Sequence, residues 1–175
     1  LNMKGKMASV IPHGVLFRGS AEGKIRKGFI NDDLIEAVIG LPSNIFYGTG
    51  IPAAILVLNK AKPEERKGKI LFIDGSNDFV KDGNKNKLRN EDIEKIVVAF
   101  DVFEDIEKYA TVVDIETIKE NDCNLNISRY VDTTEEEEQV DIQKVLNEIT
   151  ELEKKETETK NKRNGYLKEL GFDVL

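Results

Sequence analysis

The chain has 175 residues, of which 39% are hydrophobic and 34% charged, so it is long enough to bury a core. Its longest apolar run, residues 51–58, contains a proline and is too short to cross a bilayer, so the sequence predicts no membrane association. The single cysteine, Cys123, excludes an internal disulfide framework and favours a reducing, cytoplasmic location, with the thiol as a small core residue.

The formal net charge of −7 at pH 7 disfavours nucleic-acid binding at first sight, because phosphate contacts require Lys and Arg. The charge is unevenly distributed, however. Residues 133–160 hold ten acidic and four basic residues, whereas residues 1–31 hold six basic residues and one acidic residue. Within the basic end, Arg18, Lys24 and Arg26 are candidates for DNA phosphate contacts. A solvated helix face is the alternative explanation for the same three side chains.

The N-terminal half is predicted to combine several strands with one helix. Residues 8–17 are typical of a strand that runs into a turn, and residues 21–30 of a short helix that Ser20 could cap. Three further strands are predicted at residues 34–41, 51–59 and 69–73. Their apolar runs are continuous rather than alternating, which indicates strands covered on both faces, at the edge of a mixed α/β sheet.

The middle of the chain is more polar and holds shorter predicted elements. Residues 78–86 are rich in Asp, Gly and Asn and are predicted to form a loop. Asn90 is placed to cap a helix over residues 91–103, which has apolar residues along one face. Residues 109–113 and 125–131 fit either strands or extended connections.

The C-terminal segment, residues 133–175, is predicted to be a long helical extension distinct from a domain formed by residues 1–132. Thr133 or Thr134 could cap the helix, and four glutamates fall in its first turn, where the helix dipole favours them. An apolar stripe at helical spacing is followed by an almost wholly polar stretch and then by a second apolar patch. The stripe consists of Ile142, Val145, Leu146, Ile149 and Leu152, and the patch of Tyr166, Leu167, Leu170 and Phe172. Such a helix either folds back on its own domain or docks against a partner.

Residues 41–52 form the most informative segment, a loop between two predicted strands. Its adjacent aromatic residues, Phe46 and Tyr47, could offer a flat face to a planar group, and its glycines let the backbone approach a ligand closely. The loop has neither the GxGxxG spacing of a dinucleotide site nor the Lys-Ser/Thr pair of a phosphate loop. The alternative is that both aromatic side chains cap the core at a tight turn.

Several segments, taken together in order and spacing, resemble one protein family. These segments are residues 10–18 (VIPHGVLFR), 33–42 (DLIEAVIGLP), 44–52 (NIFYGTGIP), 55–60 (ILVLNK), 70–74 (ILFID) and 124–130 (NLNISRY). The succession is similar to that of the modification subunits of type I restriction–modification systems, which are adenine-N6 DNA methyltransferases. The resemblance covers about residues 5–131, and its motifs are specific in combination rather than singly.

The resemblance implies a Rossmann-like methyltransferase fold, S-adenosylmethionine as methyl donor and the N6 amine of adenine in DNA as acceptor. The catalytic Asn-Pro-Pro-Phe/Tyr loop and the glycine-rich cofactor loop of that family are absent from this sequence. We therefore expect a chain that begins inside a larger domain and supplies the distal part of an α/β sheet, with flanking helices and a C-terminal helical extension. On this interpretation it holds no catalytic, cofactor-binding or metal-binding residue and is inactive alone.

The resemblance also implies a role for the loop. An adenine methyltransferase must flip its target base out of the duplex, and the flipped base needs a wall that replaces its lost stacking. Phe46 is the first candidate for that wall and Tyr47 the second. The rest of the predicted base pocket is Gly48, Thr49 and Gly50. The one histidine, His13, stands in a Pro-His-Gly turn and is interpreted as structural, since this methylation needs no strong base.

The partners implied by the resemblance are DNA and the specificity and restriction subunits of the same system, with the C-terminal helical region contacting the specificity subunit. An alternative from another functional class is a non-catalytic interaction module that presents its acidic helix to a partner. A complete small nucleotide-binding protein is a weaker interpretation, because the sequence contains no phosphate loop.

Overall fold

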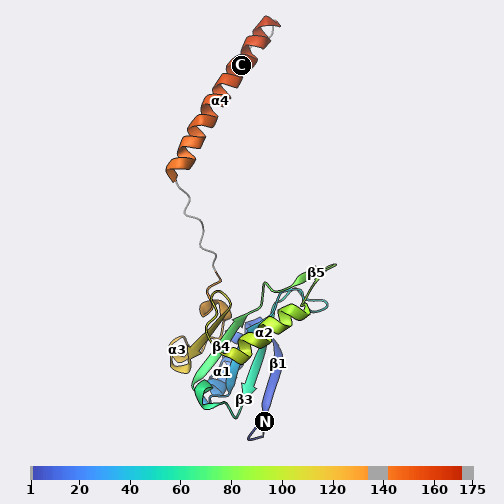
Figure 1. Cartoon of the computed structure of the whole chain (residues 1–175), viewed down its shortest axis with the longest axis vertical. Coiled ribbons are helices and arrows are strands. Elements are labelled where there is room, and N and C mark those ends of the chain that lie inside the picture. The colour runs from blue at the N-terminus through green and yellow to red at the C-terminus, as the bar shows by residue number, and fades with distance from the viewer. Residues whose placement is uncertain (1, 134–141, 171–175) are drawn as a thin grey trace. The chain divides into compact units, whose positions relative to one another are not determined.

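The computed structural model describes residues 2–133 and 142–170. The chain divides into two units, Leu1–Thr134 and Glu135–Leu175, each of which is described by itself. The first unit is built on a sheet and the second on a single helix (Figure 1).

The first unit contains a five-stranded mixed sheet in the order β1-β3-β2-β4-β7. Its strands are β1 (Lys6–Pro12), β2 (Ile35–Gly40), β3 (Ala53–Asn59), β4 (Lys69–Asp74) and β7 (Ala110–Asp114). Strands β2 and β4 are parallel, and every other neighbouring pair is antiparallel. It follows that β1, β2 and β4 run in one direction and that their carboxyl ends lie at one edge of the sheet. The predicted mixed α/β sheet is confirmed.

Helices cover both faces of the central strands. The helix α1 (Ser20–Asn31) packs through Ile30 on one face, against a cluster that includes Val38 and Phe72. The helix α2 (Asn90–Val102) packs through Ile96 on the other face and lies across the sheet in Figure 1. Every residue of β2 is buried, which explains why its apolar run is continuous. The edge strand β1 is mostly exposed.

Two predicted helix caps are wrong. Ser20 is the first residue of α1, has a positive φ of 57° and makes no capping hydrogen bond. Asn90 is likewise inside α2, whose start is held instead by Asp92. The Asp92 carboxylate accepts hydrogen bonds from the main-chain nitrogen of Arg89 at 2.8 Å and from its guanidinium, and this contact lowers the pKa of Asp92. An acidic residue in the first turn thus satisfies the main-chain donor of Arg89, the residue that precedes the helix.

Three short elements differ from the prediction. The expected loop at residues 78–86 contains a hairpin of β5 (Val80–Asp82) and β6 (Lys85–Lys87). The expected extended segment at residues 125–131 forms a 3-10 turn, η3 (Ile127–Arg129), and the helix α3 (Ile115–Glu120) was not predicted. Ile118 and Ile127 are buried, so these short helical turns are held by core packing rather than by a long periodic pattern.

The second unit is described as one helix, α4 (Ile142–Glu169). Of its predicted apolar stripe, the side chains of Leu146, Ile149 and Leu152 are described, and none of the described side chains of α4 is buried. Leu146, Ile149, Leu152 and Tyr166 are all exposed. Several residues of the predicted helix lie outside the described residues, namely Thr134, the four glutamates and Phe172. Thr133 is described and lies before the first residue of α4. No helix in the described parts of the chain combines the length and apolar character needed to span a membrane.

Candidate functional site

Three loops meet at the edge of the sheet where β1, β2 and β4 end. Main-chain hydrogen bonds join them: the His13 nitrogen donates to the Pro52 oxygen at 3.1 Å, and the Gly75 nitrogen donates to the Gly40 oxygen at 3.1 Å. Ligands of open α/β sheets bind outside the carboxyl ends of the strands, in a crevice between such loops. This edge is therefore the first place to look for a site.

A hollow of about 270 Å³ opens at this edge between the end of β1 and the loop after β2. Its lining residues are Val10, Ile11, Pro12, Phe46, Thr49, Ile51, Pro52 and Ala53. All of these side chains are apolar except Thr49. The hollow is thus an apolar surface with one hydroxyl group. Two of the five residues predicted for a base pocket, Phe46 and Thr49, line it.

The two adjacent aromatic residues of the loop have different surroundings. Phe46 lines the hollow and is 44% exposed, whereas Tyr47 is 89% exposed and its ring contacts the Lys85 ammonium of the β5–β6 hairpin. Neither ring belongs to the core of the sheet unit, so the interpretation that both cap the core does not describe them. The structure leaves Phe46 as the aromatic side chain available to a ligand in the hollow.

The loop conformation favours glycine at one position and leaves little room for a side chain at another. Gly48 has a φ of +75°, which favours glycine. A Cβ on Gly50 would lie 3.0 Å from the Asn44 side-chain oxygen, so the Asn44 amide would have to shift to admit a larger residue. The Thr49 hydroxyl oxygen accepts a hydrogen bond from the Ile51 nitrogen at 3.1 Å. Its proton therefore remains available to a ligand acceptor.

The β5–β6 hairpin supports the same loop from the other side. The Asn86 nitrogen donates to the Asn44 oxygen at 3.0 Å, and the Asn86 side-chain amide donates to the Ser43 oxygen at 2.7 Å. This hairpin was not predicted from the sequence. The Gly83-Asn84 pair between two short strands was the signal that could have predicted it.

His13 lies in the 3-10 turn η1 (His13–Leu16) that follows β1. Its ring packs edge-on against Phe17 with a centroid distance of 5.7 Å. Burial lowers the pKa of His13, and the nearby Asp74 carboxylate opposes this effect. A largely neutral ring packed against an aromatic neighbour agrees with a structural role.

The three cations proposed for phosphate contacts are not equivalent. Arg26 is only 8% exposed, and its guanidinium donates to the main-chain oxygens of Cys123 at 2.7 Å, Val15 at 2.8 Å and Arg18 at 3.0 Å. These bonds join α1 to η1 and to the segment after α3, and burial lowers the pKa of Arg26. They account for Arg26 without a ligand. Arg18 and Lys24 are exposed.

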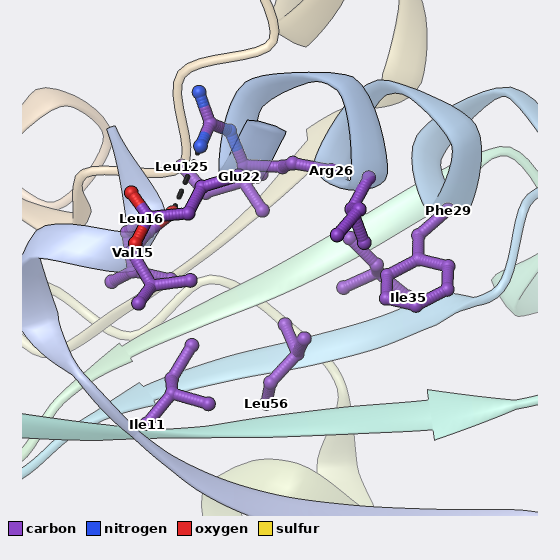
Figure 2. Close-up of a pocket in the computed structure, with 10 residues that line it drawn as sticks. Ile11, Val15, Leu16, Glu22, Arg26, Phe29, Ile35, Leu56 and Leu125 are labelled. Atoms are coloured by element: carbon purple, nitrogen blue, oxygen red, sulfur yellow. Dashed lines mark hydrogen bonds between the residues drawn. The ribbon is translucent and has the colours of Figure 1, made fainter. Parts of the chain in front are cut away.

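A second, smaller space lies beneath α1 and is almost wholly apolar (Figure 2). Its volume is about 100 Å³, and the close-up shows Arg26 bonded to Val15 at its side, while Ile11, Leu56 and Phe29 line it. It is an imperfection of packing between helix and sheet. Within residues 2–133 and 142–170, no three His, Cys, Asp or Glu side chains are grouped as metal ligands would be.

Comparison with known proteins gives the family. Residues 1–139 match the model of the N-6 DNA methylase family. The methylase subunit of the type I restriction enzyme MjaVIII of Methanocaldococcus jannaschii is 48% identical over 94% of this chain and 29% of its own length. The MpnII methylase subunit of Mycoplasma pneumoniae is 35% identical over 99% of this chain and 32% of its own length.

A solved structure agrees with these relatives. The type I restriction–modification methyltransferase subunit of Streptococcus thermophilus is 49% identical, with a TM-score of 0.69, over 74% of this chain and 27% of that one. The chain belongs to the N-6 DNA methylase family, and the predicted resemblance to type I modification subunits is confirmed. It spans about three-tenths of the length of the curated relatives it matches.

Proposed function

We propose that this chain is part of the modification subunit of a type I restriction–modification system, acting with specificity and restriction subunits to methylate adenine N6 in DNA. We further propose that it supplies one wall of the pocket for the flipped adenine, and not the groups that transfer the methyl. The observation that supports this role is the hollow lined by Phe46 at the carboxyl edge of the sheet.

The chemistry of the hollow suits a single heterocycle. Its volume of about 270 Å³ is near the lower limit of ligand pockets, roughly 300 Å³. The half-exposed Phe46 ring can replace part of the stacking that a flipped base loses, which is worth about 1–3 kcal/mol per base. The Thr49 hydroxyl can donate to a ring nitrogen, since its oxygen already accepts the Ile51 nitrogen. Gly48 and Gly50 keep the loop close to the base.

S-adenosylmethionine is the methyl donor that this function requires, and the residues that line the hollow do not fit it. The hollow has no carboxylate that could bind ribose hydroxyls, and the sequence has no glycine-rich cofactor loop. We therefore assign no cofactor or catalytic residue to this chain. Its own contribution is to orient the base and to exclude water from one side.

Substitution of Phe46 tests the base-wall role in the complete modification subunit assembled with its specificity subunit. Phe46→Ala should lower kcat/KM for DNA methylation about 5-fold to 150-fold, the equivalent of 1–3 kcal/mol, and leave S-adenosylmethionine binding near normal. Tyr47→Ala is the matched control and should have a smaller effect, because its ring lies outside the hollow. Methylation kinetics unchanged by Phe46→Ala would contradict the assignment.

Arg18 and Lys24 remain the proposed phosphate contacts at the basic end of the chain, since both are exposed. Arg26 is not retained, because three main-chain oxygens hold its guanidinium. Arg18→Ala combined with Lys24→Ala should weaken DNA binding at all sequences alike.

The helix α4 is proposed to contact the specificity subunit. At 100° per residue, Ile149 and Leu152 fall on one side of the helix, and Leu170 directly follows its last residue. All three side chains are exposed. The double substitution Ile149→Asp with Leu170→Asp should abolish binding of the specificity subunit in a pull-down while the circular dichroism of the chain is retained. Retained binding would contradict this contact.

The same exposed stripe favours the second candidate, a non-catalytic interaction module. The two functions differ in one measurement. If the Ile149→Asp and Leu170→Asp protein loses partner binding but Phe46→Ala has no effect on methylation, the interaction module is the better description.

A further inference from the structure

The β5–β6 hairpin is a basic element in an acidic chain. Residues 80–89 contain Lys81, Lys85, Lys87 and Arg89 but only one carboxylate, Asp82, whereas the whole chain has a net charge of −7. The strands pair Val80 with Lys87 and Asp82 with Lys85 around a turn at Gly83. No residue of β5 or β6 belongs to either core cluster, so burial does not explain this hairpin.

Among the described residues, no carboxylate lies within ion-pair distance of Lys81, Lys85 or Lys87, whereas Arg89 is engaged by Glu91 and Asp92. Lys81 and Lys87 are exposed. Three ammonium groups of like charge on so short a hairpin repel one another. A polyanion would relieve that repulsion.

The hairpin is also held in place beside the hollow. Asn86 bonds the loop at Ser43 and Asn44, and Lys85 contacts the ring of Tyr47. At its base, Asp78 forms an ion pair with Lys95 of α2 at 2.9 Å. Isolated two-stranded hairpins are marginal in water, so these anchors fix the position of the lysines relative to the loop that carries Phe46.

We infer that the β5–β6 hairpin binds the sugar-phosphate backbone of DNA next to the base accepted by the hollow, with Lys81 and Lys87 contacting phosphates. This inference rests on the proposed function and adds a second DNA contact to the same site. A flipped base remains attached to its own backbone, and phosphates recur about every 3.4 Å along a strand. Cations fixed at the rim of a base site therefore meet phosphates without reading sequence.

Salt dependence tests the hairpin in the complete modification subunit assembled with its specificity subunit. The affinity for a short fluorescein-labelled duplex is measured by anisotropy over a series of salt concentrations. For Lys81→Ala with Lys87→Ala, the slope of log affinity against log salt should fall by about 2, one for each lost phosphate contact. The weakening should be similar for duplexes of different sequence, because phosphate contacts do not read bases.

The matched control is Lys4→Ala with Lys60→Ala, which changes the net charge equally. Both lysines are exposed, and the Lys60 nitrogen bonds the Gly5 oxygen at the opposite end of β1 and β3. This control should keep the wild-type slope, as should Lys81→Arg with Lys87→Arg, which retains the charge. Circular dichroism checks the fold of each protein.

A slope unchanged by Lys81→Ala with Lys87→Ala, or reduced equally by the control, overturns the inference. Failure of the proposed function gives a different result. A wild-type complex that binds the duplex but transfers no methyl to adenine overturns that function, and the salt slope still decides the hairpin. A wild-type complex that binds no DNA overturns both.

Discussion

The sheet unit and the helix α4 use their apolar residues in opposite ways. In the sheet unit Phe72 is 0% exposed and stacks on Tyr130 with a centroid distance of 4.4 Å. In α4, Leu152 is 63% exposed. The sheet unit therefore derives its stability from its own core, whereas α4 retains apolar surface that only another surface can bury.

Their charged residues show the same contrast. The Glu36 carboxylate is fully buried and accepts hydrogen bonds from Asn59 at 3.0 Å and from Arg66 at 3.3 Å. In α4, Lys160 and Glu156 form an exposed pair at 2.7 Å, whose attraction is screened by water and salt. Removing a partner from the buried cluster disturbs the fold, and removing one from the exposed pair scarcely does.

Amide hydrogen exchange should show the largest difference between the two units. Amides of β2 and β4 should exchange only on global unfolding, with about 5–15 kcal/mol of protection, because both strands are buried inside the sheet. Amides of α4 should exchange orders of magnitude faster, since none of the side chains described in that helix is buried. Exchange followed by mass spectrometry measures both, and equal protection would show that α4 is packed.

Core truncation should be the next largest effect. Phe72→Ala should lower the free energy of unfolding by about 3–5 kcal/mol, because it removes a fully buried ring. Leu152→Ala in α4 should change it by no more than about 0.5 kcal/mol. Urea unfolding followed by circular dichroism gives both values. A similar loss of unfolding free energy in the two variants would contradict the difference in packing between the sheet unit and α4.

Arg26 and Lys24 provide a matched pair on one helix. Arg26→Leu should cost about 1–3 kcal/mol of stability, since it leaves buried main-chain oxygens without donors. Lys24→Leu, at an exposed position, should cost about 0.5 kcal/mol or less. Urea unfolding distinguishes them, and a stable Arg26→Leu protein would return Arg26 to the candidates for phosphate binding.

The smallest effect concerns pH. Burial lowers the pKa of His13 in the folded state below its ordinary value of 6.5, so the unfolded chain binds more protons just below that pH. The free energy of unfolding should therefore rise as the pH increases toward 6.5 and level off above it. Since His13 is the one histidine, His13→Gln should flatten the profile between about pH 5.5 and 7. A profile unchanged by His13→Gln would show that burial does not shift this group.

The sequence predicted the elements that have long apolar runs. Strands β2, β3 and β4 fall within one or two residues of their predicted positions, because strands buried on both faces consist mostly of apolar side chains. The turn η3 and the helix α3 were missed, since elements of three and six residues show no full period and are held by tertiary packing of Ile118 and Ile127.

The order and spacing of residues along the chain were sufficient to predict the family, the mixed sheet and the loop that carries two adjacent aromatic side chains. The folded structure was needed to show which of the two lines the hollow, because Phe46 and Tyr47 are adjacent in the chain and differ only in what lies next to each. The role of Arg26 was likewise visible only in the folded structure, because its guanidinium donates a hydrogen bond to the main-chain oxygen of the distant residue Cys123. The sequence shows which side chains are apolar or charged. The residues that folding places next to a side chain determine what that side chain does.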